Sequence, residues 1–413
     1  MANMKIFIFA IFVVVEGLNN GLVRTPPMGW MSWTKFYCEI DCIKHPKACI
    51  NEDLYASQAD RMAKDGYKDV GYEYIHIDDC WMSMQRDPAG RLTPNATRFP
   101  HGIKWLANHI HNLGLKFAIY EDYGTKTCGG YPGSLGHLKT DANTFAEWDV
   151  DYLKLDGCYA EESEMPKGYP EMERDLNATG RPIVYACSWP AYLISEQDKV
   201  NYTEISQHCN LWRNFDDISR SWKSILSIID WYNLYQDKMA AVHGPGQWND
   251  PDMIIAGNSE LTDDQAKAQM TIWSIWSAPL IMSNDLRDIT PSQKAILQNK
   301  EVIAIDQDPL GHFGKLIINT TDVYVYAKRV TPVDPSNHEH SWAIAVLNKA
   351  NFTVGVSIKA SILGMTNPSG YKLRDLWAHK NIGFLKGSEA KIDAKVPATG
   401  VTFYKATIAN KYN

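Results

Sequence analysis

The sequence predicts an α/β fold: a (β/α)8 TIM barrel followed by a C-terminal antiparallel β-sandwich domain. Between residues 28 and 283, eight short apolar runs recur, and each run ends in polar residues. Segments with helical spacing of apolar residues separate these runs. Strands that alternate with helices and are apolar throughout are typical of a barrel, because its strands are buried on both faces.

The eight predicted strands carry distinct motifs. In chain order, these motifs are MGWMSW, YEYIHIDDC, LKFAIYEDYG, VDYLKLDGC, PIVYACSW, LWRNFDD, QWNDPDM and APLIMSND. Two of the segments between them place apolar residues on one helical face. The first face contains Ile103, Leu106, Ala107, Ile110 and Leu113, and the second contains Trp222, Ile225, Leu226 and Ile229. A doubly wound sheet is the alternative, but it usually has a glycine-rich phosphate loop after its first strand, and this sequence has none there.

The pattern changes near residue 310, after the segment DQDPLG. Apolar residues then alternate with a period of two, and turns separate the alternating segments. These segments are DVYVYAK, SWAIAVLN, FTVGVSIK and GVTFYKAT. We therefore predict a catalytic barrel at residues 18–310 and an antiparallel β domain at residues 311–413.

The N-terminus has the pattern of a targeting segment. Lys5 precedes an apolar run at residues 6–15, and a polar segment with small residues follows it. The run is too short to span a bilayer, so we predict a cleaved signal peptide at residues 1–17. No later run is long enough to anchor the chain in a membrane. A net charge of −7 without a basic cluster also argues against a nucleic-acid partner.

The cysteine content suits an oxidising compartment. The eight cysteines are Cys38, Cys42, Cys49, Cys80, Cys128, Cys158, Cys187 and Cys209. Their spacing leaves the disulfide pairing open, and it does not suit zinc, because no histidine stands at ligand spacing. We predict neither a metal nor a cofactor. Five Asn-x-Ser/Thr motifs predict N-glycosylation at Asn95, Asn177, Asn201, Asn319 and Asn351.

Many charged residues follow the predicted strands, and the carboxyl ends of parallel barrel strands meet at one mouth. The acidic residues placed there are Asp78, Asp79, Asp122, Asp156, Asp216, Asp217, Asp250 and Asp252. Lys154, Arg213, Tyr120, Trp33, Tyr192 and Trp248 are predicted to lie with them. Ion pairs with Arg213 would account for some of the carboxylates. The others repel one another unless a metal, substrate hydroxyls or protonation relieves the repulsion.

Two chemistries use a mouth of this composition. Metal-assisted hydrolysis needs carboxylates at octahedral spacing, normally with histidine or asparagine, and histidines are sparse in these motifs. Glycoside hydrolysis needs one ionised carboxylate at the anomeric carbon and one protonated carboxyl at the leaving oxygen. Further charged groups then hold sugar hydroxyls, and an aromatic ring covers the apolar face of the sugar. The predicted mouth fits glycoside hydrolysis better.

Six motifs resemble those of glycoside hydrolase family 27, which includes lysosomal-type α-galactosidases and α-N-acetylgalactosaminidases. They are TPPMGWMSW, YEYIHIDDCW, YLKLDGC, CSWPAY, CNLWRNFDDI and WNDPDM. The resemblance extends from about residue 21 to IDQDPLG and continues more weakly into the C-terminal domain. It implies a (β/α)8 barrel, a C-terminal antiparallel β domain, and hydrolysis that retains the anomeric configuration.

The resemblance also implies individual roles. Asp156 matches the catalytic nucleophile of the family, and Asp217 matches its general acid/base. The matching sugar-binding positions are Trp33, Asp78, Asp79, Tyr120, Lys154 and Arg213, with Asp252 and Tyr192 nearby. The implied disulfides are Cys38–Cys80, Cys42–Cys49, Cys128–Cys158 and Cys187–Cys209. A homodimer delivered to the lysosome through N-glycans is implied as well, with secretion as the alternative.

The motif CSWPAY carries the specificity signal. The galactosidase branch has glutamate and a larger apolar residue where this chain has Ser188 and Ala191. Small residues at both positions leave room for a 2-acetamido group. We therefore expect an exo-glycosidase that removes terminal α-linked N-acetylgalactosamine from glycolipids, glycopeptides and oligosaccharides. An α-galactosidase and an inactive carbohydrate-binding protein are the alternatives.

Two expectations concern the electrostatics of the mouth. A neighbouring ionised Asp156 should raise the pKa of Asp217, which must begin the reaction protonated. Glu121 stands where relatives commonly have a small residue, so the contacts of Asp122 could differ from those of the family.

Overall fold

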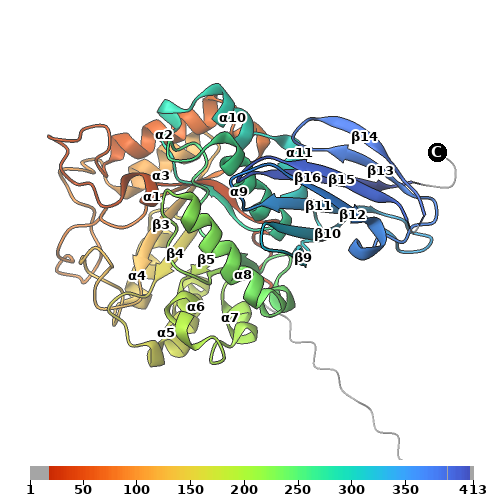
Figure 1. Ribbon diagram of the computed structural model, residues 1–413. Helices are drawn as coiled ribbons and strands as arrows, with labels where there is room; N and C mark the ends of the chain where they lie inside the picture. Colours follow the sequence, from red (N-terminus) through yellow and green to blue (C-terminus); the bar gives the residue numbers. More distant parts are fainter. Residues whose placement is uncertain (1–17, 388, 410–413) are drawn as a thin grey trace, which may run out of the picture.

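The computed structural model describes residues 18–387 and 389–409. Figure 1 shows a barrel, coloured from red to green, beside a β domain in blue. The predicted signal peptide at residues 1–17 lies outside the described residues. Within the described part of the chain, no helix is both long enough and apolar enough to cross a membrane.

The barrel sheet contains eight parallel strands, in the order β7-β6-β5-β4-β3-β2-β1-β8. Their bounds are β1 (Met28–Met31), β2 (Tyr74–His76), β3 (Lys116–Asp122), β4 (Tyr152–Asp156), β5 (Val184–Cys187), β6 (Leu211–Arg213), β7 (Trp248–Asp250) and β8 (Leu280–Met282). A parallel bridge between Ile254 and Met282 joins the segment after β7 to β8. Each of the eight predicted motifs contributes one strand, and nearly all strand residues are buried, as the apolar runs predict.

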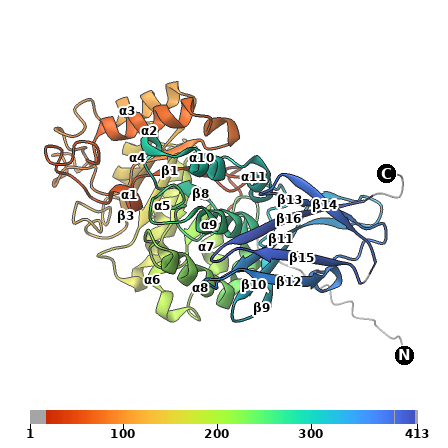
Figure 2. The same cartoon turned by 45° about the horizontal axis from the view of Figure 1, so that its top comes forward.

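Helices surround these strands in both views (Figures 1 and 2). The longer ones are α2 (Glu52–Lys64), α3 (Ile103–Asn112), α4 (Leu138–Glu147), α5 (Met165–Ala178), α8 (Trp222–Val242) and α9 (Asp263–Trp276). The shorter ones are α1 (Trp33–Phe36), α6 (Trp189–Tyr192), α7 (Tyr202–His208), α10 (Pro291–Leu297) and α11 (Lys300–Asp306). The apolar spacing places both expected helices correctly, at α3 and α8.

Four of the five residues on the predicted face of α3 are buried, and the fifth, Leu113, is half-buried just after the helix. The face predicted for α8 is only partly buried. In α8 the buried residues include Ile225 and Ile229, whereas Trp222 and Leu226 are half-buried. The polar side of α8 contacts the β domain, where the Tyr324 hydroxyl donates to Asp230 at 2.7 Å. Because α8 faces both the barrel and the β domain, a single apolar stripe does not describe its packing.

The C-terminal strands are antiparallel and form two sheets. The larger sheet has the order β14-β13-β16-β11-β10-β9, and the smaller one pairs β12 with β15. Their bounds are β9 (Lys315–Asn319), β10 (Val323–Val333), β11 (His340–Asn348), β12 (Val354–Lys359), β13 (Tyr371–Asp375), β14 (Lys380–Leu385), β15 (Lys391–Val396) and β16 (Val401–Ile408). The four predicted segments correspond to β10, β11, β12 and β16. Apolar residues such as Val325, Ile344 and Ile358 form the core of this domain.

Buried polar contacts fix the β domain against the barrel helices. The Lys328 ammonium, on β10, donates to the carbonyl oxygens of Ile305 at 2.7 Å and Ser274 at 3.2 Å. Burial lowers the pKa of Lys328 to about 8, although Asp306 opposes this shift. Asn299 caps α11 by accepting from Glu301 and Val302, and its amide donates to the Leu376 carbonyl at 3.1 Å.

All eight cysteines form disulfides. The pairs are Cys38–Cys80, Cys42–Cys49, Cys128–Cys158 and Cys187–Cys209. This is the pairing that the family resemblance implies. Each bond lies within the barrel half of the chain.

We predict that Asn299→Ala destabilises the protein more than the loss of an ordinary helix cap. The change removes the cap of α11 and leaves the buried Leu376 carbonyl without its donor. Loss of a cap costs about 1 kcal/mol, and an unsatisfied buried group adds about 1–3 kcal/mol. Asn51→Ala, which removes the cap of α2, is the matched control. Thermal unfolding should show the larger fall in Tm for Asn299→Ala, and an equal or smaller fall would contradict this role.

Candidate active site

A cavity of about 490 Å³ opens at the carboxyl end of the barrel strands. The residues that line it are Asp156, Ser188, Ala191, Tyr192, Arg213, Phe215, Asp216 and Asp217. Asp156 is the last residue of β4, and Asp217 lies in the loop after β6. The fold therefore brings both predicted catalytic carboxylates, and both predicted specificity residues, to one cavity.

Hydrogen bonds fix the Asp156 carboxylate. The Tyr192 hydroxyl donates to Oδ1 at 2.7 Å, and the Gly157 amide donates to the same oxygen at 3.1 Å. The Cys128 sulfur, in its disulfide with Cys158, lies 3.6 Å from Oδ2. The Tyr192 hydroxyl is itself 3.3 Å from the Cys158 sulfur. Asp156 is thus held between α6 and a disulfide, and these contacts set its orientation.

Lys154 lies on the same strand as Asp156, two residues earlier. Its ammonium donates to Asp78 at 2.8 Å and lies 5.1 Å from the centre of the Tyr120 ring. Burial alone would lower the pKa of Lys154, but the carboxylates of Asp78 and Asp156 outweigh burial and raise it. Burial raises the pKa of Asp78, and Lys154 opposes that shift. Lys154 therefore remains a cation at the base of the site.

Arg213, the last residue of β6, pairs with two carboxylates. It donates to Asp217 Oδ1 at 3.0 Å and lies 3.0 Å from Asp252 Oδ1. Asp252 also accepts a hydrogen bond from the Ile218 amide at 2.8 Å. Burial raises the pKa of Asp252 to about 6 despite the guanidinium. The Asp217 side chain is 70% exposed at the rim, whereas that of Asp252 is 4% exposed.

The expected pKa shift of Asp217 is wrong. Although its side chain reaches the solvent at the rim, partial desolvation among the surrounding residues would raise the pKa of Asp217; the charges of Arg213 and Lys154 outweigh this effect and lower the pKa. The expectation considered only the repulsion from Asp156. It missed the guanidinium four residues earlier, which hydrogen-bonds directly to the carboxylate.

Asp79 and Asp122 anchor backbone loops around the site. Asp79 accepts from the amides of Gly129 and Cys80, both at 2.6 Å, and burial raises its pKa to about 6. Asp122 accepts from Gly124 at 2.7 Å and from Cys158 at 3.0 Å. Burial, and secondarily the charge of Asp156, raises the pKa of Asp122 to about 8. Asp122 thereby links β3 to the loop that follows the predicted nucleophile.

The prediction that Trp248 lies at the mouth is wrong. Trp248 is the first residue of β7 and is packed against Tyr74, Tyr152 and Leu211 in the lower barrel. Its indole nitrogen donates to the Val23 carbonyl at 2.7 Å. Trp248 begins β7 and Asp250 ends it at the mouth, so Asp250 lies closer to the site than Trp248 does. Asp250 lines a small inner cavity with Lys154, Ser188 and Arg213.

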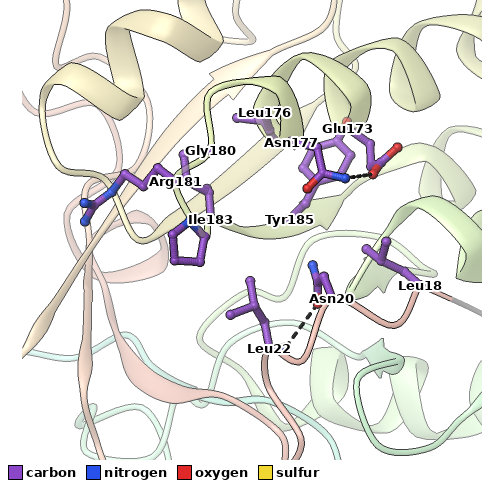
Figure 3. A pocket seen from close by; sticks show the side chains of 11 residues that line it. Leu18, Asn20, Leu22, Glu173, Leu176, Asn177, Gly180, Arg181, Ile183 and Tyr185 are labelled. Carbon is purple, nitrogen blue, oxygen red and sulfur yellow. Dashed lines mark hydrogen bonds between the residues drawn. The ribbon is translucent and has the colours of Figure 1, made fainter.

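A second cavity, of about 200 Å³, lies at the opposite end of the barrel strands (Figure 3). Among its lining residues, Glu173 is the one carboxylate, and it accepts a hydrogen bond from Asn177 at 3.3 Å. The backbone at Leu18 and Leu22 forms its other side. The residues that line this cavity include one carboxylate and not two, so they do not suit glycoside hydrolysis, which needs a general acid and a nucleophile.

Comparison with known proteins gives the family. Residues 25–308 match the melibiase model described as alpha galactosidase A, and residues 322–406 match the model of the alpha galactosidase C-terminal beta sandwich domain. This chain belongs to the melibiase family. It is a glycoside hydrolase of family 27.

Individual members of the melibiase family are similar over most of the chain. The alpha-N-acetylgalactosaminidase of Gallus gallus is 49% identical, covering 89% of this chain and 90% of that protein. Alpha-galactosidase A of Homo sapiens is 46% identical, covering 93% of this chain and 89% of that protein. The crystal structure of alpha-galactosidase I from Mortierella vinacea has a TM-score of 0.83 at 31% identity, covering 94% of this chain and 98% of that one.

Sequence reasoning missed two features of this melibiase site. Phe215 lines the cavity, and its place between Arg213 and Asp217 in the motif LWRNFDD could have indicated this. The Cys128–Cys158 disulfide lies against Asp156. The implied pairing contained that information, because Cys158 follows Asp156 by two residues.

Glu121 does not line the cavity, although it lies between Tyr120 and Asp122. Successive side chains of a strand point to opposite faces, so Glu121 faces the helix layer. It is fully buried, 3.4 Å from the Ser134 hydroxyl, which itself donates to Asp141 of α4 at 2.7 Å. Burial, followed by the charge of Asp141, raises the pKa of Glu121 well above its ordinary value. Asp122 keeps its backbone contacts despite this neighbour.

We predict that in the Glu121→Gln variant the stability of the fold falls less with rising pH than it does in wild type. The folded chain keeps the Glu121 proton above the ordinary glutamate pKa of about 4.3, whereas the unfolded chain releases it. The stability associated with this proton is therefore present at low pH and is lost as pH rises toward the folded pKa. As pH rises over this range, the free energy of unfolding of the glutamine variant should increase relative to that of wild type by up to about 1.4 kcal/mol per pH unit.

Thermal unfolding between pH 4.5 and 7.5 measures this effect. Glu162→Gln, at an exposed position, should leave the slope of Tm against pH unchanged. Parallel curves for Glu121→Gln and wild type would show that Glu121 does not hold its proton.

Proposed function

We propose that this chain is a retaining exo-glycosidase that removes terminal α-linked N-acetylgalactosamine from glycolipids, glycopeptides and oligosaccharides. The observation that carries the proposal is the position of Ser188 and Ala191 on the same cavity as Asp156 and Asp217. The Ala191 amide donates to the Ser188 carbonyl at 3.1 Å, so both small residues lie on one turn at the start of α6. That turn leaves space beside the predicted nucleophile for an acetamido group.

In the first proposed step, an Asp156 oxygen attacks the anomeric carbon as the bond to the leaving oxygen breaks. Protonated Asp217 gives its proton to that oxygen, and the aglycone departs. In the second step, Asp217 removes a proton from water, and the water oxygen displaces Asp156 from the anomeric carbon. Two inversions restore the original α configuration.

Lys154 and Arg213 support these steps in different ways. Lys154 stays charged near Asp156 and can donate to sugar hydroxyls, from which Asp78 can accept. Arg213 favours the ionised form of Asp217, which is the form the second step needs. The first step needs the protonated form, so the arrangement suits an acidic compartment.

The destination that we propose is the lysosome, reached through the secretory pathway, with secretion as the alternative. A predicted signal peptide, four disulfides and five glycosylation motifs support this route. Asn177, Asn201, Asn319 and Asn351 are exposed, and Asn95 is half-buried. The implied homodimer remains a prediction.

An α-galactosidase is the second candidate, because the chain is nearly as similar to a galactosidase as to an N-acetylgalactosaminidase. Overall identity therefore does not separate the two activities, and the small side chains of Ser188 and Ala191 on the cavity support the N-acetylgalactosaminidase. A carbohydrate-binding protein without activity is disfavoured, because both carboxylates line the cavity in ordered positions.

We predict that Asp217→Gly lowers hydrolysis by about 10²–10⁴-fold and that azide restores turnover of a substrate with a good leaving group. Such an aglycone departs without protonation, and azide then replaces water in the second step. The expected product is the α-glycosyl azide, because two inversions still occur. Asp156→Gly is the matched control, and its azide product would have the β configuration. NMR of the products distinguishes them, and a β azide from Asp217→Gly would contradict the assignment.

We predict that the double change Ser188→Glu with Ala191→Leu exchanges the substrate preference. Leucine fills the acetamido space, and the new carboxylate accepts a hydrogen bond from a 2-hydroxyl, a contact of about 1.5–3 kcal/mol. Relative kcat/KM on aryl α-N-acetylgalactosaminide and aryl α-galactoside measures the exchange. Wild type should prefer the N-acetyl sugar. If the wild-type protein prefers the galactoside, the result would favour an α-galactosidase over an α-N-acetylgalactosaminidase.

A further inference from the structure

The direction in which the leaving group departs can be followed on the structure. Asp217 gives its proton to the leaving oxygen in the proposed reaction, so the aglycone must pass beside Asp217. The loop after Asp217 contacts α1, because the Thr34 hydroxyl lies 3.5 Å from the Ile218 carbonyl. The rim on this side is therefore built from two segments, the end of α1 and the start of the β6–α8 loop.

Tyr37 directly follows α1, and Arg220 follows Ile218 by two residues on the other segment. The Tyr37 ring lies 5.8 Å from the Trp33 ring, nearly perpendicular to it, and its residue is 44% exposed. The Arg220 guanidinium is 6.0 Å from the centre of the Tyr37 ring. Glu260 holds Arg220 from the other side at 3.3 Å. A partly exposed aromatic ring and a half-buried cation thus lie together, beside the predicted sugar-binding Trp33.

The backbone holds Tyr37 in a conformation that needs support. Its φ of +48° lies in a region that residues other than glycine rarely occupy. The Tyr37 amide donates to the Trp33 carbonyl, and the next residue, Cys38, is joined by a disulfide to Cys80 beside Asp79. The chain therefore fixes this ring next to the site instead of leaving it on a free loop.

We infer that Tyr37 and Arg220 form a binding site for the aglycone, and that its occupant is the second sugar ring of an oligosaccharide. This inference rests on the proposed function. A pyranose has an apolar face that can lie on an aromatic ring and hydroxyls at its edge that accept from a guanidinium. Asp216 and Ser219 are exposed on the same loop and add polar groups for those hydroxyls. A lipid chain would need a continuous apolar surface, whereas this rim sets Asp216, Ser219 and Arg220 beside the rings of Phe215 and Tyr37.

The test compares two substrates that differ only in the aglycone. Methyl α-N-acetylgalactosaminide has no second ring, whereas a disaccharide with N-acetylgalactosamine α-linked to galactose has one. Tyr37→Ala should lower kcat/KM on the disaccharide about fivefold to tenfold and leave the methyl glycoside unchanged. Tyr37→Phe should retain activity on both, because the ring remains. Arg220→Ala should reduce activity on the disaccharide alone.

Tyr159→Ala is the matched control. Tyr159 is 62% exposed but lies on the loop after β4, on the side of the predicted nucleophile. Tyr159→Ala should leave kcat/KM unchanged on both substrates. Released N-acetylgalactosamine is measured for each variant, and unchanged Tm values show that the variants fold.

Several outcomes would overturn the inference. Equal losses on both substrates for Tyr37→Ala would mean that Tyr37 acts through Trp33 and not through the aglycone. A selective loss on a serine-linked glycopeptide, with the disaccharide unaffected, would assign the rim to peptide. If the wild-type protein cleaves both substrates and Tyr37→Ala shows no selective loss on the disaccharide, the inference about the aglycone site is overturned while the proposed function stands. Wild-type protein that cleaves neither substrate overturns the proposed function.

Discussion

Arg213 is shared by Asp217 and Asp252, and the arrangement of the mouth depends on this one cation. Asp252 is buried, and an uncompensated charge there would be costly, so the guanidinium offsets its desolvation. The same guanidinium reaches outward to Asp217 at the rim. Asp252 in turn binds the Ile218 amide, which fixes the loop that carries Asp217. Arg213 thereby contributes to the position of the predicted acid/base, through Asp252, and together with Lys154 to its lowered pKa.

Lys154 is the second buried cation of the site, and it pairs with Asp78 as Arg213 pairs with Asp252. It is charged and buried, it donates a hydrogen bond to Asp78, and the carboxylates of Asp78 and Asp156 raise its pKa against the effect of burial. Both cations stand at the carboxyl ends of strands, where the parallel sheet brings side chains from distant parts of the sequence together. Burial raises the pKa of several neighbouring acids, among them Asp79, Asp122 and Asp252, and the two cations do not offset it there. Sugar hydroxyls can donate hydrogen bonds to the carboxylates that remain ionised.

The sequence allows the barrel and most of the site to be predicted. Asp156 ends an apolar run before a glycine, so its position at a strand end follows from the pattern. Trp248 could not be placed in the same way, because a motif does not show at which residue its strand begins. The pKa of Asp217 depends on a contact with Arg213, and the environment of Glu121 depends on Ser134 and Asp141. These contacts depend on how strands, helices and loops pack together, which periodicity does not describe. The specificity residues were found through the family resemblance and not through periodicity.

The role of Asp156 as nucleophile is the central claim, and trapping of the glycosyl-enzyme tests it most directly. A fluorinated glycosyl fluoride with a slow second step should inactivate the enzyme with one sugar bound per chain. Proteolysis and mass spectrometry should then place the sugar on Asp156, within the peptide that contains YLKLDGC. A sugar on another carboxylate, or full turnover with no covalent species at any time, would contradict the account.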